Sequence, residues 1–228
     1  RMAGLPGGRF GSPVGIPAAI VGRQLDGTYR LTLVDLDNDG NLDLITAAGG
    51  CGVDVFPGTG KGTYGPPVEA INFTCEGTRH GFFRDLTLCD FNGDGRPDMF
   101  VCMLSQDANE RGRCFLGINE GGFRFTECAT QFGLKGAEEN VDACVGDIDG
   151  RPGLELVVLE STRIVSYDLA GLHAESRGGR IGPVPHRVIT NQASVVLDAR
   201  MISLQDLDGD GRAELILSRD SGPAILRL

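Results

Sequence analysis

The sequence predicts an all-β protein, a β-propeller with four repeats of about 57 residues, each forming a four-stranded antiparallel blade. The first observation is an acidic segment that recurs at even spacing, with leading aspartates at Asp35, Asp90, Asp147 and Asp206. The second is a glycine-rich segment that keeps step with it, beginning at Gly7, Gly60, Gly121 and Gly178. Self-similarity at a fixed period is typical of repeat architectures. Four short antiparallel strands per repeat favour a propeller, and a stacked solenoid is the rival architecture.

Each repeat contains short runs of aliphatic and β-branched residues, which predict strands of about five residues. In the first repeat these runs cover residues 31–34, 44–46, 53–56 and 64–71. The acidic segment lies between the first two strands, and the glycine-rich turn precedes the last. One repeat is therefore strand, acidic turn, strand, strand, glycine turn and strand.

The repeats predict a single propeller domain over residues 1–228. Residues 1–20 supply the last strand of a blade, and residues 196–228 supply the first strands of the final blade. Three complete blades cover residues 28–73, 80–130 and 140–190. The two chain ends can therefore pair and close a four-bladed ring, or the four repeats form an arc of a larger propeller. The sequence leaves both alternatives open.

Amino-acid composition and net charge indicate which kinds of ligand the protein can bind. With 35 glycines, 11 prolines and only 6% aromatic residues, the chain has many turns and little long helix. A net charge of -10 disfavours nucleic acid and anionic lipid surfaces, because both would repel the protein. No apolar run approaches the roughly 20 residues of a membrane helix, so direct membrane insertion is not expected. Cations are the natural partners.

The first acidic segment, DLDNDGNLD, has the spacing of a calcium loop. Its acidic side chains are at positions 1, 3, 5 and 9, and position 7 can supply a backbone carbonyl; these residues are Asp35, Asp37, Asp39, Asp43 and Asn41. Six or seven flexible oxygen ligands suit Ca²⁺ better than Mg²⁺, and zinc would need His or Cys. An EF-hand closes with Glu at position 12 between helices, so these loops are a different, strand-flanked type.

Two further segments keep this ligand pattern, and we expect about three bound Ca²⁺ in all. The second segment offers Asp90, Asn92, Asp94, the Arg96 carbonyl and Asp98. The fourth offers Asp206, Asp208, Asp210, the Arg212 carbonyl and Glu214. Because Asn92 is neutral, the second loop should bind more weakly. The simpler alternative is that Asp-Gly pairs only make tight hairpins, but a turn does not need four spaced acids.

The third segment departs from the pattern. It contains Asp147, Asp149, Arg151 and Glu155, with Arg151 where the third acidic ligand belongs. We expect the Arg151 guanidinium, or nothing, to fill the place of the ion. Calcium in this loop would contradict that hypothesis.

The cysteines and one sequon predict a secretory protein. Seven cysteines lack the CxxC spacing of zinc or redox sites. Two pairs straddle equivalent glycine-turn hairpins and are predicted disulfides, Cys51 with Cys75 and Cys114 with Cys128. Cys89, Cys102 and Cys144 remain, and the sequence does not choose among their partners. Asn72 begins an Asn-Phe-Thr glycosylation sequon.

Taken together, the DxDxDGxxD loops and the GGRFG and GKGTYG turns resemble the FG-GAP and VCBS repeats of integrin α-subunit propellers and many secreted proteins. The stretch FLGINEGGFRFTECATQFGL more particularly resembles the cartilage acidic protein type of repeat. The resemblance covers almost the whole chain. It implies structural ions in loops at the blade rim, recognition elsewhere on the propeller face, and no common catalytic residue.

The sequence thus predicts a calcium-binding adhesion or interaction module, extracellular or in the secretory lumen, with a protein or glycan ligand. One alternative is a lectin. Another is a lyase or dehydratase that acts on sugars, because some relatives with this fold resemble such enzymes. No catalytic residue is assigned. A deep cleft holding His186 or another titratable cluster would favour the enzyme, and a flat face would favour adhesion.

Overall fold

The protein is an all-β propeller of four blades, as predicted. The computed structural model describes residues 4–5, 9–10, 28–48, 52–72, 82–104, 114–134, 139–169 and 183–228. Within these residues the sheets are antiparallel, and the one α-helix, α2 (Ala193–Val196), has four residues. No helix in this part of the chain has the length and hydrophobicity that a membrane span requires.

Each blade is a meander in which strands that follow one another in sequence pair with each other. The first blade consists of β3 (Thr28–Val34), β4 (Asp43–Ala48), β5 (Gly52–Phe56) and β6 (Val68–Asn72). The second consists of β7 (Phe82–Cys89), β8 (Asp98–Leu104), β9 (Cys114–Asn119) and β10 (Phe125–Glu127). The third consists of β11 (Asn140–Gly146), β12 (Glu155–Glu160), β13 (Ile164–Asp168) and β14 (His186–Thr190). The last has β15 (Ala199–Gln205), β16 (Glu214–Arg219) and β17 (Ala224–Leu226).

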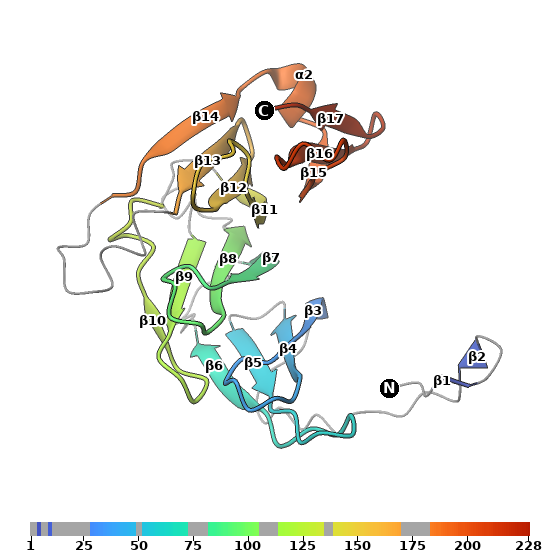
Figure 1. The fold of residues 1–228 in the computed structure, drawn as a ribbon, viewed down its shortest axis with the longest axis vertical. Helices are drawn as coiled ribbons and strands as arrows, with labels where there is room; N and C mark the ends of the chain where they lie inside the picture. Colours follow the sequence, from blue (N-terminus) through green and yellow to red (C-terminus); the bar gives the residue numbers. More distant parts are fainter. Residues whose placement is uncertain are drawn as a thin grey trace.

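The blades follow one another along an arc (Figure 1). The first strands, β3, β7, β11 and β15, lie on its inner side, where β7 packs against β3 and β11, and β11 packs against β15. Near the N-terminus, β1 (Gly4–Leu5) pairs with β2 (Arg9–Phe10), and β17 pairs with β16. No pairing between these two ends occurs among the described residues, and residues 11–27 lie outside them. Ring closure by the chain ends stays a prediction.

The hydrophobic core lies between blades. One cluster joins the first blade to the second, another joins the second to the third, and a third joins the third to the last. The second residue of each acidic loop belongs to these clusters in three blades, where Leu36, Phe91 and Ile148 are fully or almost fully buried. Leu36, for example, packs with Leu86 of the following blade. Each loop therefore inserts one large apolar side chain into its neighbour.

The last blade breaks this rule. Its equivalent residue, Leu207, is 51% exposed. No blade follows it among the described residues, so the side chain has nothing to pack against.

Because Phe91 is buried and Leu207 is exposed, truncating each of them to alanine should change the free energy of unfolding by different amounts. Phe91→Ala should lower the free energy of unfolding by about 3–5 kcal/mol, because it leaves a cavity between two blades. Leu207→Ala is the matched control and should change it by about 0.5 kcal/mol or less. Urea unfolding of dilute protein measures both. Equal losses in the two variants would contradict the inter-blade role of the loops.

Candidate functional site

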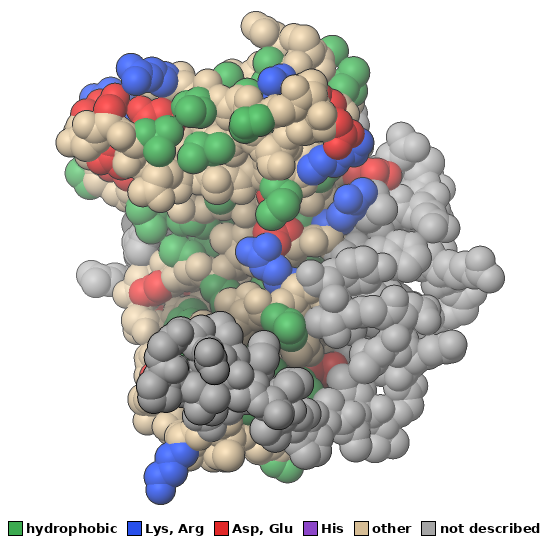
Figure 2. Space-filling model, turned by 90° about the vertical axis from the view of Figure 1, so that its right-hand side faces the viewer, with side chains coloured by type: hydrophobic (Ala, Val, Ile, Leu, Met, Phe, Trp, Pro, Cys, Tyr) green, Lys and Arg blue, Asp and Glu red, His purple; other side chains and the backbone are tan. Residues whose placement is uncertain are grey.

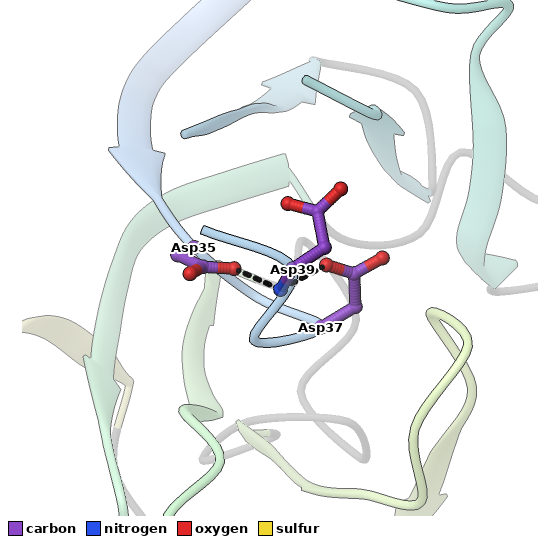
Figure 3. A group of neighbouring side chains, drawn as sticks. All are labelled: Asp35, Asp37 and Asp39. Carbon is purple, nitrogen blue, oxygen red and sulfur yellow. Dashed lines mark hydrogen bonds between the residues drawn. The ribbon is translucent and has the colours of Figure 1, made fainter. Parts of the chain in front are cut away.

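The first acidic loop folds around its own backbone amides. Asp35 accepts hydrogen bonds from the backbone N–H groups of Asp39 and Gly40, at 3.0 and 2.9 Å, and Asp37 accepts a second bond from Asp39 at 3.2 Å. Gly40 has φ of 87°, a left-handed conformation that glycine adopts without strain. Figure 3 shows the three carboxylates gathered around the loop. One oxygen from each lies within 4.8 Å of the others.

These three carboxylates fit a hard cation. Burial raises the pKa of Asp37, and the nearby Asp39, Asp43 and Asp35 raise it further. Gathered oxygen ligands with unrelieved negative charge are the donor set that Ca²⁺ takes in proteins. The ion would be held by Asp35, Asp37 and Asp39.

The last acidic loop repeats the arrangement. Asp206 accepts hydrogen bonds from the backbone N–H groups of Gly209 and Gly211, at 2.6 and 3.0 Å. The carboxylates of Asp206, Asp208 and Asp210 again bring oxygens within 4.8 Å of one another. This loop therefore fits the same kind of cation.

The second loop is arranged differently. Asp90 accepts bonds from three loop amides, as expected, but Asp94 pairs with the guanidinium of Arg96 and accepts a bond from the side-chain amide of Asn92. In the part of the chain that the structure describes, this loop forms no comparable group of three carboxylates. A cation would have to displace Arg96 from Asp94.

The third loop does gather three acids. Oxygens of Asp147, Asp149 and Glu155 lie within 4.8 Å of one another, and burial raises the pKa of Glu155. Arg151 is 82% exposed, and its Nε lies 3.6 Å from an Asp149 oxygen. The guanidinium thus lies beside one acid. The hypothesis that this loop takes no ion stays a prediction.

The last acid of each loop, at position 9 of the motif and called the closing acid here, accepts hydrogen bonds that the sequence did not reveal. Asp43 accepts one hydrogen bond from the N–H of Leu36 and another from the N–H of Gly58, at 2.9 and 2.7 Å. Asp98 likewise binds the N–H groups of Phe91 and Asn119, both at 2.8 Å.

Each closing acid therefore accepts a hydrogen bond from the backbone N–H of the loop's second residue. In the first blade it also binds the turn after the third strand, and in the second blade it binds the end of the third strand. Glu155 and Glu214 make the corresponding bonds to Ile148 and Leu207, at 3.0 and 2.9 Å. Burial raises the pKa of Asp98 to about 6, although the bonds from Asn119 and Phe91 oppose the shift.

Sequence reasoning missed Asn119. This side chain is fully buried, and its amide donates to the carbonyl oxygens of Leu36 in the first blade and Pro97 in its own, both at 2.9 Å. Its oxygen accepts a bond from the N–H of Gly121. It connects the acidic loops of two blades. The only available signal was a polar residue at the end of an otherwise apolar strand.

A cavity of about 490 Å³ lies between the first strands of all four blades. Each of these strands has a β-bulge at the same register, and the residues that follow the bulge are Arg30, Asp85, Asp142 and Met201. Bulges redirect side chains next to them. All four of these residues line the cavity.

The polar residues of this cavity connect all four blades. Arg30 Nη1 lies 3.1 Å from Asp85 Oδ1, Asp85 and Asp142 share a hydrogen bond, and Asp142 accepts the N–H of Ile202 at 2.7 Å. Burial raises the pKa of Asp142 to about 7, and the neighbouring Asp85 raises it further. The Asp142 carboxyl group therefore keeps its proton at mildly acidic pH. His186 is exposed on β14 and does not line this cavity.

The structure corrects one disulfide prediction. Cys114 Sγ donates a hydrogen bond to the Leu134 carbonyl at 3.3 Å and Cys128 Sγ to the Thr126 carbonyl at 3.5 Å, so the two sulfurs are not bonded to each other. The residue opposite Cys114 on the neighbouring strand is Cys102. A hairpin that brings two segments together need not bring their sulfurs together.

The second predicted disulfide and most of the predicted glycosylation sequon lie outside the residues that the structure describes. Cys51 and Cys75 are outside the described residues. Asn72 ends β6, and the rest of its sequon is also outside.

Comparison with known families identifies the repeat. The model of the FG-GAP-like repeat matches residues 35–101 and 90–158, which together make up more than half of the chain. The chain belongs to the FG-GAP-like repeat family. Both matches begin at the leading aspartate of an acidic loop, so the FG-GAP unit contains the loop and the strands that flank it. No curated protein sequence matches the chain significantly.

Two solved structures are similar in fold. A lectin from Agrocybe aegerita that recognises non-reducing terminal N-acetylglucosamine superposes with a TM-score of 0.57 at 19% identity, over 89% of this chain and 50% of the lectin. BBS1N, solved in complex with ARL6DN, superposes with a TM-score of 0.50 at 14% identity, over 88% of this chain and 54% of its own. The FG-GAP chain therefore spans about half the length of each. At these identities the similarity shows the fold alone.

The carboxyl pair predicts a specific pH dependence. The pKa of Asp142 rises from 3.8 to about 7 on folding, so the folded state binds the extra proton and its stability falls as pH increases from about 4 to about 7. Asp142→Asn imitates the protonated form, because it can still donate to Asp85 and accept from Ile202. Between pH 5 and pH 8 the wild type should lose about 2–3 kcal/mol relative to this variant.

Thermal and urea unfolding at several pH values measure this difference. The acidic loops are the same in both proteins, so any contribution from them cancels in the comparison. Parallel stability curves would show that Asp142 has an ordinary pKa.

Proposed function

We propose that this FG-GAP chain is a calcium-stabilised interaction module that holds structural Ca²⁺ in its acidic loops. The observation that carries the proposal is that three leading aspartates gather within 4.8 Å at equivalent places in loops 35–43 and 206–214. Bound ions would offset part of the net charge of -10. Because the loops connect neighbouring blades, ion binding should be coupled to the stability of the whole arc.

The loops should differ in affinity. Loops 35–43 and 206–214 each bring three aspartates together, so they should bind most tightly. Loop 90–98 has the neutral Asn92, and Arg96 competes for Asp94, so it should bind third and more weakly. We expect about three Ca²⁺ at saturation. We expect none in loop 147–155, although Glu155 completes a group of three carboxylates there, because Arg151 stands where the other loops have their third ligand and its guanidinium lies beside Asp149.

The partner is a protein or a glycan, bound on the propeller face in an extracellular or secretory-lumen setting. The net charge of -10 disfavours nucleic acid and anionic lipid as ligands. The Asn72 sequon supports the secretory setting, and occupancy of that asparagine in protein secreted from cultured cells would test it.

Glycan binding is the second candidate. The axial cavity places hydroxyl groups of Thr32 and Ser203 near the carboxyl groups of Asp85 and Asp142, a mixture that suits hydroxylated ligands. The similar lectin shows that a propeller of this fold can serve as a sugar receptor. A glycan array with wild-type protein tests it, and binding lost in Asp85→Ala would place the sugar in the cavity.

Calcium binding itself has a direct test. Native mass spectrometry should find about three Ca²⁺, and excess EGTA should lower the melting temperature by several degrees. Asp39→Asn keeps an oxygen for the N–H of Asn41 but removes one charged ligand, so it should lose the ion of loop 35–43.

Asp220→Asn is the control, because it makes the same charge change in an exposed residue paired with Arg200, outside every loop. It should keep all the ions. If wild-type protein bound no Ca²⁺ and EGTA left its melting temperature unchanged, the loops would be turns only. An ion found in loop 147–155 would contradict the assignment of that loop.

A further inference from the structure

The third and last acidic loops are joined by a backbone hydrogen bond. The N–H of Ala213, in the last loop, donates to the carbonyl oxygen of Asp147, the leading residue of the third loop, at 2.9 Å. The side chain of Arg212 lies against the third loop as well, because a Cβ on Gly150 would be only 2.9 Å from Arg212 Nε. The third loop therefore contacts both the side chain of Arg212 and the peptide group that follows it.

The peptide group that makes this hydrogen bond also carries an expected calcium ligand. Arg212 is at position 7 of the last loop, the position whose backbone carbonyl is expected to bind the ion. The Arg212 carbonyl and the Ala213 N–H belong to one planar trans peptide group, so they point in opposite directions. Holding the N–H on Asp147 therefore fixes the direction of the carbonyl.

A different contact joins the first two loops. The second loop has Pro97 where the last has Ala213, and proline has no N–H to donate. Here Asn38 of the first loop donates its side-chain amide to the carbonyl oxygen of Gly95 at 3.0 Å. Asn38 and Gly150 are the fourth residues of their loops, and both have a positive φ, 62° and 71°. At both junctions this position faces the following loop, so contact between loops is a feature of the repeat.

The carboxylates of the last loop are open to solvent. Asp208 and Asp210 are exposed, and Figure 2 shows acidic side chains with basic ones beside them on the upper part of the molecule, where Figure 1 places the last blade. An exposed loop loses conformational freedom when it closes on an ion. A ligand that is already held in place reduces this cost and so raises the affinity.

We propose that the third loop is a positioning element for the calcium site of the last loop, because its bond from Asp147 to Ala213 holds the Arg212 carbonyl in place for the ion. This inference rests on the proposed binding of Ca²⁺ in loop 206–214. It gives the third loop, which is expected to hold no ion, a role in binding the ion of its neighbour. Ala213 is a positioning residue, since its N–H contacts the third loop and not the ion.

Calcium titration followed by amide NMR tests the proposal one loop at a time. The N–H groups of Gly40 and Gly211 bind the leading aspartates of their loops, so each reports on one ion site. Ala213→Pro removes the donor, as Pro97 does naturally in the second loop, and should weaken binding at Gly211 by about three- to ten-fold. Ala213→Ser keeps the N–H and should bind as the wild type does. Binding at Gly40, in the first blade, should not change.

A second substitution separates the hydrogen bond from any direct effect of proline on the last loop. Asp147→Ala keeps the backbone carbonyl but removes the carboxylate that accepts the N–H groups of Asp149 and Gly150, and so loosens the third loop. It should weaken binding at Gly211 by about two-fold or more in the wild type, and by a smaller factor in Ala213→Pro, where the connection is missing. The charge removed is the same in both backgrounds, so its effect cancels.

Circular dichroism checks that each variant folds. If Ala213→Pro does not, Asp147→Ala is compared with Asp220→Ala, which removes the same charge outside both loops, and equal effects of these two would overturn the proposal. Unchanged binding at Gly211 in Ala213→Pro, or equal effects of Asp147→Ala in both backgrounds, would also overturn it while leaving calcium binding itself intact. No response to calcium at Gly40 or Gly211 in wild-type protein would overturn the proposed function, and this inference with it.

Discussion

The architecture depends on one large side chain that each of the first three acidic loops inserts into the following blade. Leu36, Phe91 and Ile148 are buried there, and the closing acid of each loop holds that residue's backbone N–H. An isolated meander of four short strands has no core of its own. Packing between blades supplies the core, so the loop is as much a part of the hydrophobic interface as the strands are.

Polar contacts complete this interface on both sides of the loops. At the rim, Asn119 joins its own blade to the backbone of the preceding loop. On the inner side of the arc, the bulges direct the side chains of Arg30, Asp85 and Asp142 into the cavity. There these side chains connect the first strands of the blades. Burying such groups is tolerable only because each has partners. In the acidic loops the leading carboxylates lie together and repel one another, a repulsion that a bound cation would relieve.

The repeat made most of the fold predictable, because spacing alone located the blades and the strand order within them. The position of Asp35, Asp37 and Asp39 in one group also followed from the sequence. The hydrogen bonds of the closing acids could not be predicted from the sequence. Asp98, for example, accepts a bond from the N–H of Asn119, 21 residues away, and a local motif cannot reveal such a partner. The prediction of a Cys114–Cys128 disulfide failed for a related reason. Equivalent positions on a hairpin indicate proximity, whereas side-chain direction depends on strand register, which places Cys102 opposite Cys114.

Amide hydrogen exchange by NMR tests the central role of the loop insertion most directly. In dilute protein, the N–H groups of Leu36, Phe91 and Ile148 should exchange slowly, with similar free energies of opening close to that of global unfolding. The N–H of Leu207 binds its closing acid in the same way, but the Leu207 side chain is 51% exposed and none of the described blades covers it. It should therefore exchange much faster. Equal protection at all four positions would show that the carboxylate hydrogen bonds alone hold the loops, and would contradict an architecture built on insertion between blades.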